Sequence, residues 1–306
     1  MSFEIENISY EIGEKTLEIK DYCQSRNKDY SRLIQKTGFE QTHHTSKSYQ
    51  DFFGGFLTNK LNLKSNDGII LVNQSAQEII PGILPKLFLN LPNIESITTF
   101  QISDGCSGFV KALILADSLL SSANFNRIHI ICAEKYSDYF HEDNESLMPI
   151  FSDAISVTTL RKGAHYRITS LDTINNFIDY RKISVDASTS LLSMEGSNVY
   201  GWVTANTVPQ IERVLLENDI STKDVKSWQI HQASQVMVGG ILERLKIEGE
   251  FIFNSSKVGN TVSSSIPISI QNSFGTSNDL SQNGYHVLSG FGVGLTSVVA
   301  VLEASR

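Results

Sequence analysis

The chain has 306 residues, 41% of them apolar, which is enough to bury a large core in one α/β domain or in two similar halves. Its formal net charge of -8 and the lack of a dense run of Lys and Arg argue against nucleic-acid binding. No apolar run reaches transmembrane length and the N-terminus lacks a signal-peptide pattern, so we expect a cytoplasmic protein that does not bind a membrane. Three widely spaced cysteines, Cys23, Cys106 and Cys132, suit a reducing compartment and exclude a disulfide framework or zinc site.

The first part of the chain alternates strand-like apolar runs with helical patterns. Residues 68–72 and 97–101 are predicted strands, a helix begins at residue 106, and residues 128–132 form the next strand. This βαβ order predicts a mostly parallel, buried sheet. Two further strands, 151–160 and 166–171, joined around a turn at 161–163, close a first half that we place at residues 1–172.

The second half, residues 173–306, repeats a similar order. Its predicted elements are a helix at 208–216, a strand at 227–230, a helix after residue 234, a strand at 251–253 and a glycine-containing hairpin at 285–302. No low-complexity linker separates the halves, so we expect them to share one compact body of the α/β class.

Cys106 is a candidate nucleophile at the start of a helix. The helix carries apolar residues at three-and-four spacing, so it is expected to lie against a sheet and to hold its amino end still. A thiol at a helix amino terminus meets unpaired N–H groups and the positive end of the helix dipole, which lower the thiol pKa. The alternative is a small buried residue at a strand-to-helix junction.

Two other strand-to-helix corners carry polar side chains. His231 follows a predicted strand, at the edge where functional groups of open α/β sheets gather, and Asn260 lies at a third corner. Taken alone, a histidine at such a place is more often a structural hydrogen-bonding residue than a catalytic one, and an asparagine like Asn260 is more often a turn or helix-cap residue. His43 and His44 lie in a polar segment without cysteine or carboxylate partners at ligand spacing, so we predict that they are solvated and bind no metal.

The segments 104–109, 231–234, 259–261 and 290–294 together resemble the four active-site motifs of the type III β-ketoacyl-acyl-carrier-protein synthases, which are thiolase-fold condensing enzymes. Further matches lie at residues 36–38, 151–153 and 194–196, so the resemblance spans almost the whole chain. It implies a five-layer αβαβα fold of two similar halves, a homodimer, and catalysis without a cofactor or metal.

The resemblance also implies a Cys-His-Asn triad of Cys106, His231 and Asn260. Cys106 would accept an acyl group from a thioester, and His231 and Asn260 would donate hydrogen bonds to the oxygen of a malonyl thioester as it loses carbon dioxide. The enolate would then attack the acyl group in a decarboxylative Claisen condensation. The oxyanion hole would consist of the backbone N–H groups of Cys106 and Val293, the latter standing where the family has glycine.

Departures from the family pattern bear on the substrate. Arg32 and Glu145 replace the tryptophan and arginine that sandwich the adenine of coenzyme A, which favours an acyl carrier protein as the acyl donor. Lys36, Arg244 and Lys246 remain as a reduced basic patch for such a carrier. Ile80 stands at the acyl pocket where an aliphatic side chain leaves room for a group longer than acetyl.

Three function classes remain open. The first is the condensing enzyme of lipid or specialised-metabolite synthesis. The second is an acyltransferase that passes the acyl group from Cys106 to an alcohol or amine, with His231 as general base. The third is a non-catalytic partner of a catalytic paralogue, a class against which the presence of Cys106, His231 and Asn260 counts.

Overall fold

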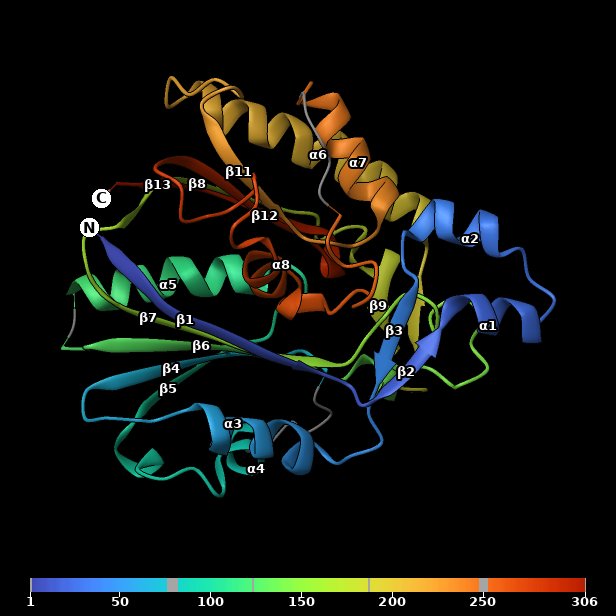
Figure 1. Ribbon diagram of the computed structural model, residues 1–306, viewed down its shortest axis with the longest axis horizontal. Helices are drawn as coiled ribbons and strands as arrows, with labels where there is room; N and C mark the ends of the chain where they lie inside the picture. The colour runs from blue at the N-terminus through green and yellow to red at the C-terminus, as the bar shows by residue number, and fades with distance from the viewer. Residues whose placement is uncertain (1, 76–81, 123, 187, 248–252, 306) are drawn as a thin grey trace.

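Two mixed β-sheets form the frame of the protein, which we describe from a computed structural model covering residues 2–75, 82–122, 124–186, 188–247 and 253–305 (Figure 1). In spatial order, the first sheet contains β5 (Thr98–Ile102), β4 (Asp67–Val72), β6 (Arg127–Glu134), β7 (Ala154–Lys162) and β1 (Phe3–Ile12). The second contains β8 (Tyr166–Asn175), β13 (Thr296–Ala304), β12 (Gly284–Gly292) and β11 (Val225–Ile230). A single backbone pair, Phe3 with Tyr166, joins the two sheets.

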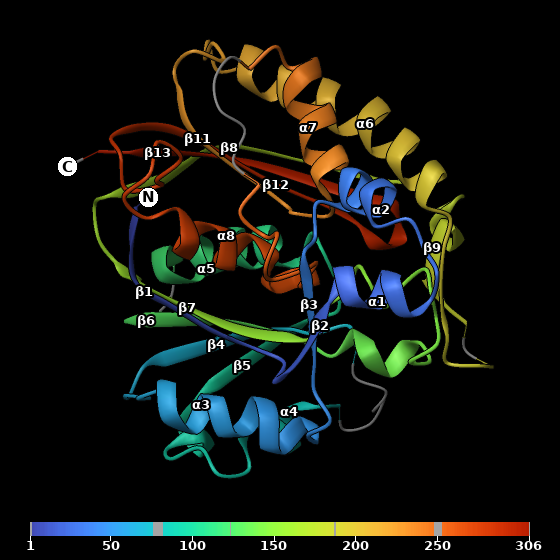
Figure 2. The ribbon, with the colours of Figure 1, turned by 45° about the vertical axis from the view of Figure 1, so that its right-hand side comes forward.

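The helices lie in three layers around these sheets (Figures 1 and 2). Between the sheets lie α5 (Gly108–Ser122) and α8 (Ser265–Ser273). The outer face of the first sheet is covered by α3 (Gly55–Lys60) and α4 (Leu84–Phe88), and that of the second by α6 (Gly196–Leu216) and α7 (Gln235–Arg244). The predicted five-layer αβαβα arrangement is therefore confirmed.

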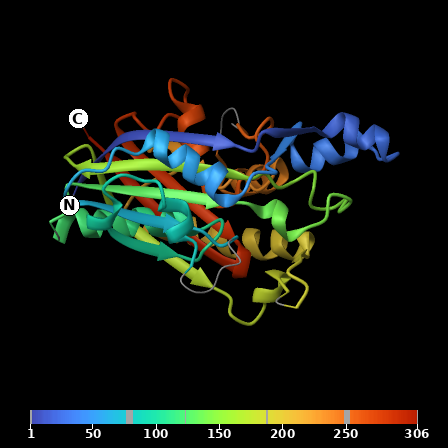
Figure 3. The same ribbon diagram turned by 90° about the horizontal axis from the view of Figure 1, so that it is seen from below.

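Smaller elements extend from one end of the layers, opposite the two chain termini (Figure 3). They are α1 (Ile19–Ser25), α2 (Tyr30–Thr37) and the strand pair β2 (Lys15–Glu18) and β3 (Gln41–His44). A second strand pair is formed by β9 (Ile183–Val185) and β10 (Leu192–Met194). Short helical turns occur along the whole chain: η1 (Gln50–Gly54), η2 (Ile94–Ser96), η3 (Tyr136–Tyr139), η4 (Tyr180–Lys182), η5 (Val262–Ser264) and η6 (Val293–Leu295). Within the described ranges, no helix has both the length and the apolar character needed to cross a bilayer.

The β4, β5 and β6 strands are parallel as predicted, but the end of the first half differs from the prediction. The strands expected at 151–160 and 166–171 do not form a neighbouring pair, because β1, for which the sequence analysis placed no strand, pairs with β7 and lies between β7 and β8. The chain crosses at this turn to the second sheet, where β8 pairs with β13. The division at residue 172 stays a prediction, and that residue lies inside β8.

Other predicted elements are longer than expected or lie partly outside the described residues. The helix predicted at 208–216 is the C-terminal part of α6, which continues through Pro209. The strand predicted at 251–253 falls largely on residues 248–252, which are not described.

The α5 helix lies at the centre of the fold and holds the segment that carries Cys106. Its predicted apolar face is buried, and it comprises Phe109, Ala112, Leu113, Ala116 and Leu120. Val110 on another face is also buried, since α5 has a sheet on either side. Burial on both sides fixes the helix against rotation, so the segment that precedes it is held in place.

Candidate active site

One cavity of about 380 Å³ brings together the three predicted site residues: Cys106, His231 and Asn260 all line it. Each side chain is almost fully buried, with exposed fractions of 4%, 1% and 5%, so they face a shared interior space and not separate surfaces. The remaining walls are mainly apolar and come from α2, α6, α7, β9, β10, β12 and the 150–151 segment. They include Thr37, Ile150, Phe151, Ile183, Met194, Val199, Tyr200, Val236, Met237, Phe291 and Gly292.

Cys106 lies in the turn between β5 and α5. The prediction that it opens the helix is off by two residues, because α5 begins at Gly108. Gly292 at the end of β12 approaches this cysteine so closely that a Cβ there would lie 3.0 Å from the Cys106 sulfur. Gly292 also has a φ of +147°, which side-chain-bearing residues rarely adopt, so both space and backbone shape require glycine.

The thiol of Cys106 does not have the lowered pKa that we predicted from its position before a helix. Burial raises the pKa to about 12, although hydrogen bonds from the backbone N–H groups of Val293 and Cys106 act to lower it. The predicted lowering of the pKa was wrong because it omitted the free-energy cost of placing a thiolate in a closed apolar cavity. The N–H groups of Cys106 and Val293 nevertheless stabilise negative charge on the sulfur, and their role as an oxyanion hole stays a prediction.

Val293 supplies its N–H without backbone strain. Its φ is not among the positive values of the described residues, whereas its neighbours Gly292 and Gly294 both have a positive φ. The glycines therefore make the turn, and a valine between them keeps the amide in place.

His231 directly follows β11, and its backbone N–H donates to the carbonyl of Ser289 on β12 (2.9 Å). The imidazole packs edge-on against Phe291, with ring centroids 5.5 Å apart. Its Nδ1 is buried and has no hydrogen-bond partner in the described part of the chain. Burial lowers the pKa of His231 to about 3, so the imidazole is neutral at physiological pH.

Asn260 is fixed by backbone and side-chain hydrogen bonds. Its N–H donates to Ile150 O, its carbonyl accepts from Ser152 N–H, and its Oδ1 accepts from Val262 N–H at 3.0 Å. Because Oδ1 is engaged inside its own turn, the carboxamide presents its NH₂ group as the donor. Asn260 can therefore act as an oriented hydrogen-bond donor at the cavity wall.

The prediction that His43 and His44 are solvated is wrong. Both are buried in β3, where His44 Nε2 bonds to Phe151 O and His43 Nε2 to Lys257 O, each at 2.9 Å. They brace the two chain segments that flank Asn260. The strand was not predicted because residues 41–44 are all polar and lack the alternation of apolar and polar side chains that indicates a strand. Within the described residues, no group of three His, Cys, Asp or Glu side chains is arranged to hold a metal ion.

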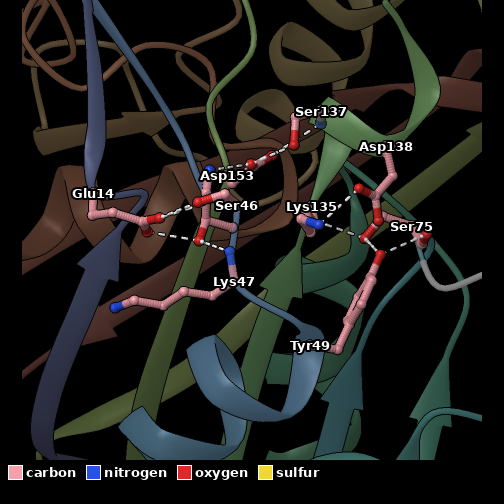
Figure 4. Close-up of polar contacts among 10 residues, drawn as sticks. Glu14, Ser46, Lys47, Tyr49, Ser75, Lys135, Ser137, Asp138 and Asp153 are labelled. Carbon is pink, nitrogen blue, oxygen red and sulfur yellow. Dashed lines mark hydrogen bonds and ion pairs between the residues drawn. The ribbon is translucent and has the colours of Figure 1, made fainter.

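A polar network lies behind the site (Figure 4). The buried Asp153 accepts hydrogen bonds from Ser137 N–H (2.9 Å), Ser137 Oγ (2.6 Å) and Thr45 N–H (2.9 Å). Glu14 accepts from Thr45 Oγ1 (2.6 Å) and Ser46 N–H (3.0 Å), so the network joins the N-terminal strands to β7 and η3. Asp153 belongs to the predicted 151–153 motif and has a structural role here.

A second cavity, of about 230 Å³, lies on the other side of the 292–294 turn. It is lined by Gln74, Tyr136, Tyr139, Tyr180, Ile183, Ser184, Val185, Leu192, Val293 and Gly294. Val293 reaches it from the turn that contacts Cys106, and Ile183 lines both cavities. The sequence analysis did not identify this space. The residue that it assigned to an acyl pocket, Ile80, lies outside the described residues.

At the mouth of the first cavity the structure places Lys36 on the wall, at the end of α2. Glu145 pairs with Lys28 (2.6 Å), and Arg32 lies near the start of α2. Arg244 lies over the ring of Tyr200 and donates to its hydroxyl group (3.4 Å). The basic groups near the entrance are therefore few and partly engaged with other side chains.

The low pKa of His231 predicts that its imidazole does not titrate between pH 5 and 8. Histidine-selective NMR of labelled protein, with the signal assigned by comparison with His231→Asn, should show constant ring shifts across this range. A His231 signal that moves through a midpoint in that range contradicts the neutral resting state.

Comparisons with known proteins show which family the chain is similar to. A family model for 3-Oxoacyl-[acyl-carrier-protein (ACP)] synthase III matches residues 100–178, and the model of its C-terminal part matches residues 215–304, which together cover more than half of the chain. The Beta-ketoacyl-[acyl-carrier-protein] synthase III of Lactococcus lactis subsp. lactis (strain IL1403) is 22% identical over 321 residues, covering 98% of each chain.

A second curated relative of the same name, from Rickettsia canadensis (strain McKiel), is 27% identical over 240 residues, or 75% of this chain and 74% of its own. Among solved structures, that of 3-oxoacyl-[acyl-carrier-protein] synthase III from Aquifex aeolicus VF5 is similar with a TM-score of 0.86, at 21% identity, covering 99% of this chain and all of that one. This likeness establishes the thiolase-like fold.

Proposed function

The chain belongs to the 3-oxoacyl-[acyl-carrier-protein] synthase III family, and we propose that it is a condensing enzyme that joins an acyl group to a malonyl thioester. Its product would serve fatty acid or polyketide synthesis. The observation that carries this proposal is the cavity that Cys106, His231 and Asn260 line together. The neutral thiol and neutral imidazole determine how each step proceeds.

In the first step the Cys106 sulfur attacks the carbonyl carbon of an acyl thioester. The new C–S bond forms, the bond to the donor sulfur breaks, and the thiol proton leaves with the donor thiol. The oxyanion formed in between accepts hydrogen bonds from the N–H groups of Cys106 and Val293, which already lie at the sulfur. This backbone pair compensates for the raised pKa of the thiol, because it stabilises the charge where it develops.

In the second step a malonyl thioester enters the same cavity and loses carbon dioxide. The electron pair of the broken C–C bond passes into an enolate, whose oxygen accepts hydrogen bonds from His231 and from the Asn260 NH₂ group. The enolate carbon then attacks the acyl group on Cys106; a C–C bond forms, the C–S bond to Cys106 breaks, and the thiol regains a proton.

The low pKa of His231 favours condensation over acyl transfer to an alcohol or amine. A general base for the latter reaction works best with a pKa near the operating pH, and burial lowers that of His231 to about 3. A neutral imidazole is instead well suited to donating a hydrogen bond. The same buried, convergent arrangement argues against a purely structural partner, which has no use for it.

We propose an acyl carrier protein as the acyl donor, because relatives are named for that partner and the mouth offers little to coenzyme A. Glu145, at the expected adenine site, is negatively charged and paired with Lys28. The acyl group itself would pass beyond Cys106 towards the second cavity.

Stepwise assays of the purified protein test this function. Intact-mass spectrometry after incubation with acyl carrier proteins and coenzyme A thioesters of graded chain length should detect an acyl adduct on the wild type and none on Cys106→Ala. Subsequent malonyl carrier protein should release carbon dioxide and a β-ketoacyl product. The Asn260→Asp variant should still be acylated, while its decarboxylation falls about a hundredfold or more because one oxyanion donor is lost.

Asn124→Asp, an exposed residue beyond the far end of α5, is the matched control and should behave as the wild type. Acylation followed by transfer to added alcohols or amines without carbon dioxide release contradicts condensation. Absence of any adduct on Cys106 contradicts catalysis altogether, and strict preference for acetyl rejects the larger acyl pocket.

We propose further that the protein is a homodimer. In the described sheet, β5 is an edge strand that pairs with β4 on one side, and its other edge is available to a strand of a second copy. Light scattering coupled to size-exclusion chromatography should give twice the mass of the chain, and a monomer at micromolar concentration contradicts the proposal.

A further inference from the structure

A buried carboxylate ends the strand next to the active site. Glu134, the last residue of β6, has no exposed surface. Its carboxylate accepts hydrogen bonds from Gln74 N–H (3.2 Å), Ser75 N–H (3.0 Å) and the hydroxyl group of Ser263 (3.1 Å). A carboxylate with this many donors is held in one orientation, and it holds the donors in turn.

On one side Glu134 fixes the 74–75 segment, which packs next to Cys106. The Gln74 side-chain oxygen accepts from the Tyr136 hydroxyl group (3.1 Å) and lies 2.6 Å from where a Cβ on Gly105 would be. Ser75 is held by Tyr49, whose hydroxyl group donates to the Ser75 carbonyl at 2.8 Å (Figure 4). The 74–75 segment is thus packed directly against the residue that precedes the nucleophile.

On the other side Glu134 fixes the turn that orients Asn260. Ser263 lies in η5, whose first residue, Val262, donates its N–H to Asn260 Oδ1. A Val262 methyl group lies 3.2 Å from the same Cβ position on Gly105. The segments that carry Cys106 and Asn260 therefore meet at Gly105. The Glu134 carboxylate accepts hydrogen bonds from residues that pack against each of these segments.

We propose that Glu134 is a positioning residue: its carboxylate keeps the turn of Asn260 and the segment behind Cys106 in one arrangement, and its charge restrains the reactivity of the Cys106 thiol. The part concerning Asn260 rests on the proposed condensation. The part concerning the thiol does not, because it is a property of the resting protein.

The electrostatics agree with this geometry. Burial raises the pKa of Glu134 to about 7, and its negative charge in turn raises the pKa of the Cys106 thiol. Removing the charge therefore lowers the thiol pKa. The titratable groups under its influence are Cys106, Cys132, Tyr49, Tyr136 and Tyr139, and the adjacent Lys135 is paired with Asp138 (2.8 Å).

Two variants separate the charge from the hydrogen bonds. In Glu134→Gln the charge is lost, so alkylation of Cys106 by iodoacetamide at pH 8 should become faster by about threefold or more. Decarboxylation should nevertheless fall about tenfold in kcat, with little change in KM, because the amide cannot accept from all the donors and the Asn260 turn loosens. In Ser263→Ala one donor is lost, which raises the Glu134 pKa further; at a pH well above that pKa the charge stays. There kcat should fall severalfold while the alkylation rate remains that of the wild type.

Glu217→Gln, which removes an exposed carboxylate at the end of α6, is the control and should change neither readout. A wild-type alkylation profile in Glu134→Gln overturns the electrostatic role, and wild-type kcat in both test variants overturns the positioning role. If Glu134→Gln does not fold, wild-type turnover of Ser263→Ala alone overturns the proposal. Alkylation needs no acyl donor, so a protein that labels as expected but does not condense malonyl thioesters refutes only the proposed function.

Discussion

The arrangement depends on one contact between the two sheets, where the turn after β12 meets the segment before α5. The Val293 N–H lies near the Cys106 sulfur and stabilises its thiolate, and Gly292 leaves room for the sulfur only because it has no side chain. The nucleophile comes from a helix mounted between the sheets, and its backbone donor comes from the hairpin of the second sheet. Their separation is therefore set by the packing of the whole five-layer body.

Burial sets the chemistry of this site. The same closed surroundings raise the pKa of Cys106 and lower that of His231, so the resting pair is neutral and is not a thiolate facing an imidazolium. Charge is stabilised by oriented donors at the positions where it develops. Asn260 illustrates this, because its own turn occupies the side-chain oxygen and leaves the NH₂ group to donate.

The triad residues were predictable because the four motifs occur in the family's order and because Cys106 and His231 each follow a strand and precede a helix. Their pKa values were not, because burial arises from distant segments that a local argument about a helix end omits. The N-terminal strand β1 and the histidines of β3 were missed for a related reason. Their segments contain many polar residues and become ordered and buried through contacts with β7 and with the 151–153 segment, which are distant in the chain. Glu134 gave no local signal, since its donors lie about 60 and 130 residues away in the chain.

The 292–294 turn contributes residues to both cavities, and we propose that the acyl donor enters by the first and that the acyl group lies towards the second. A crystal structure of the protein acylated on Cys106 is the most direct test. We predict that the thioester oxygen accepts hydrogen bonds from the N–H groups of Cys106 and Val293, while His231 and Asn260 face the open cavity beside it. An acyl oxygen turned away from Val293, or an acyl group carried by another residue, would contradict the proposed mechanism.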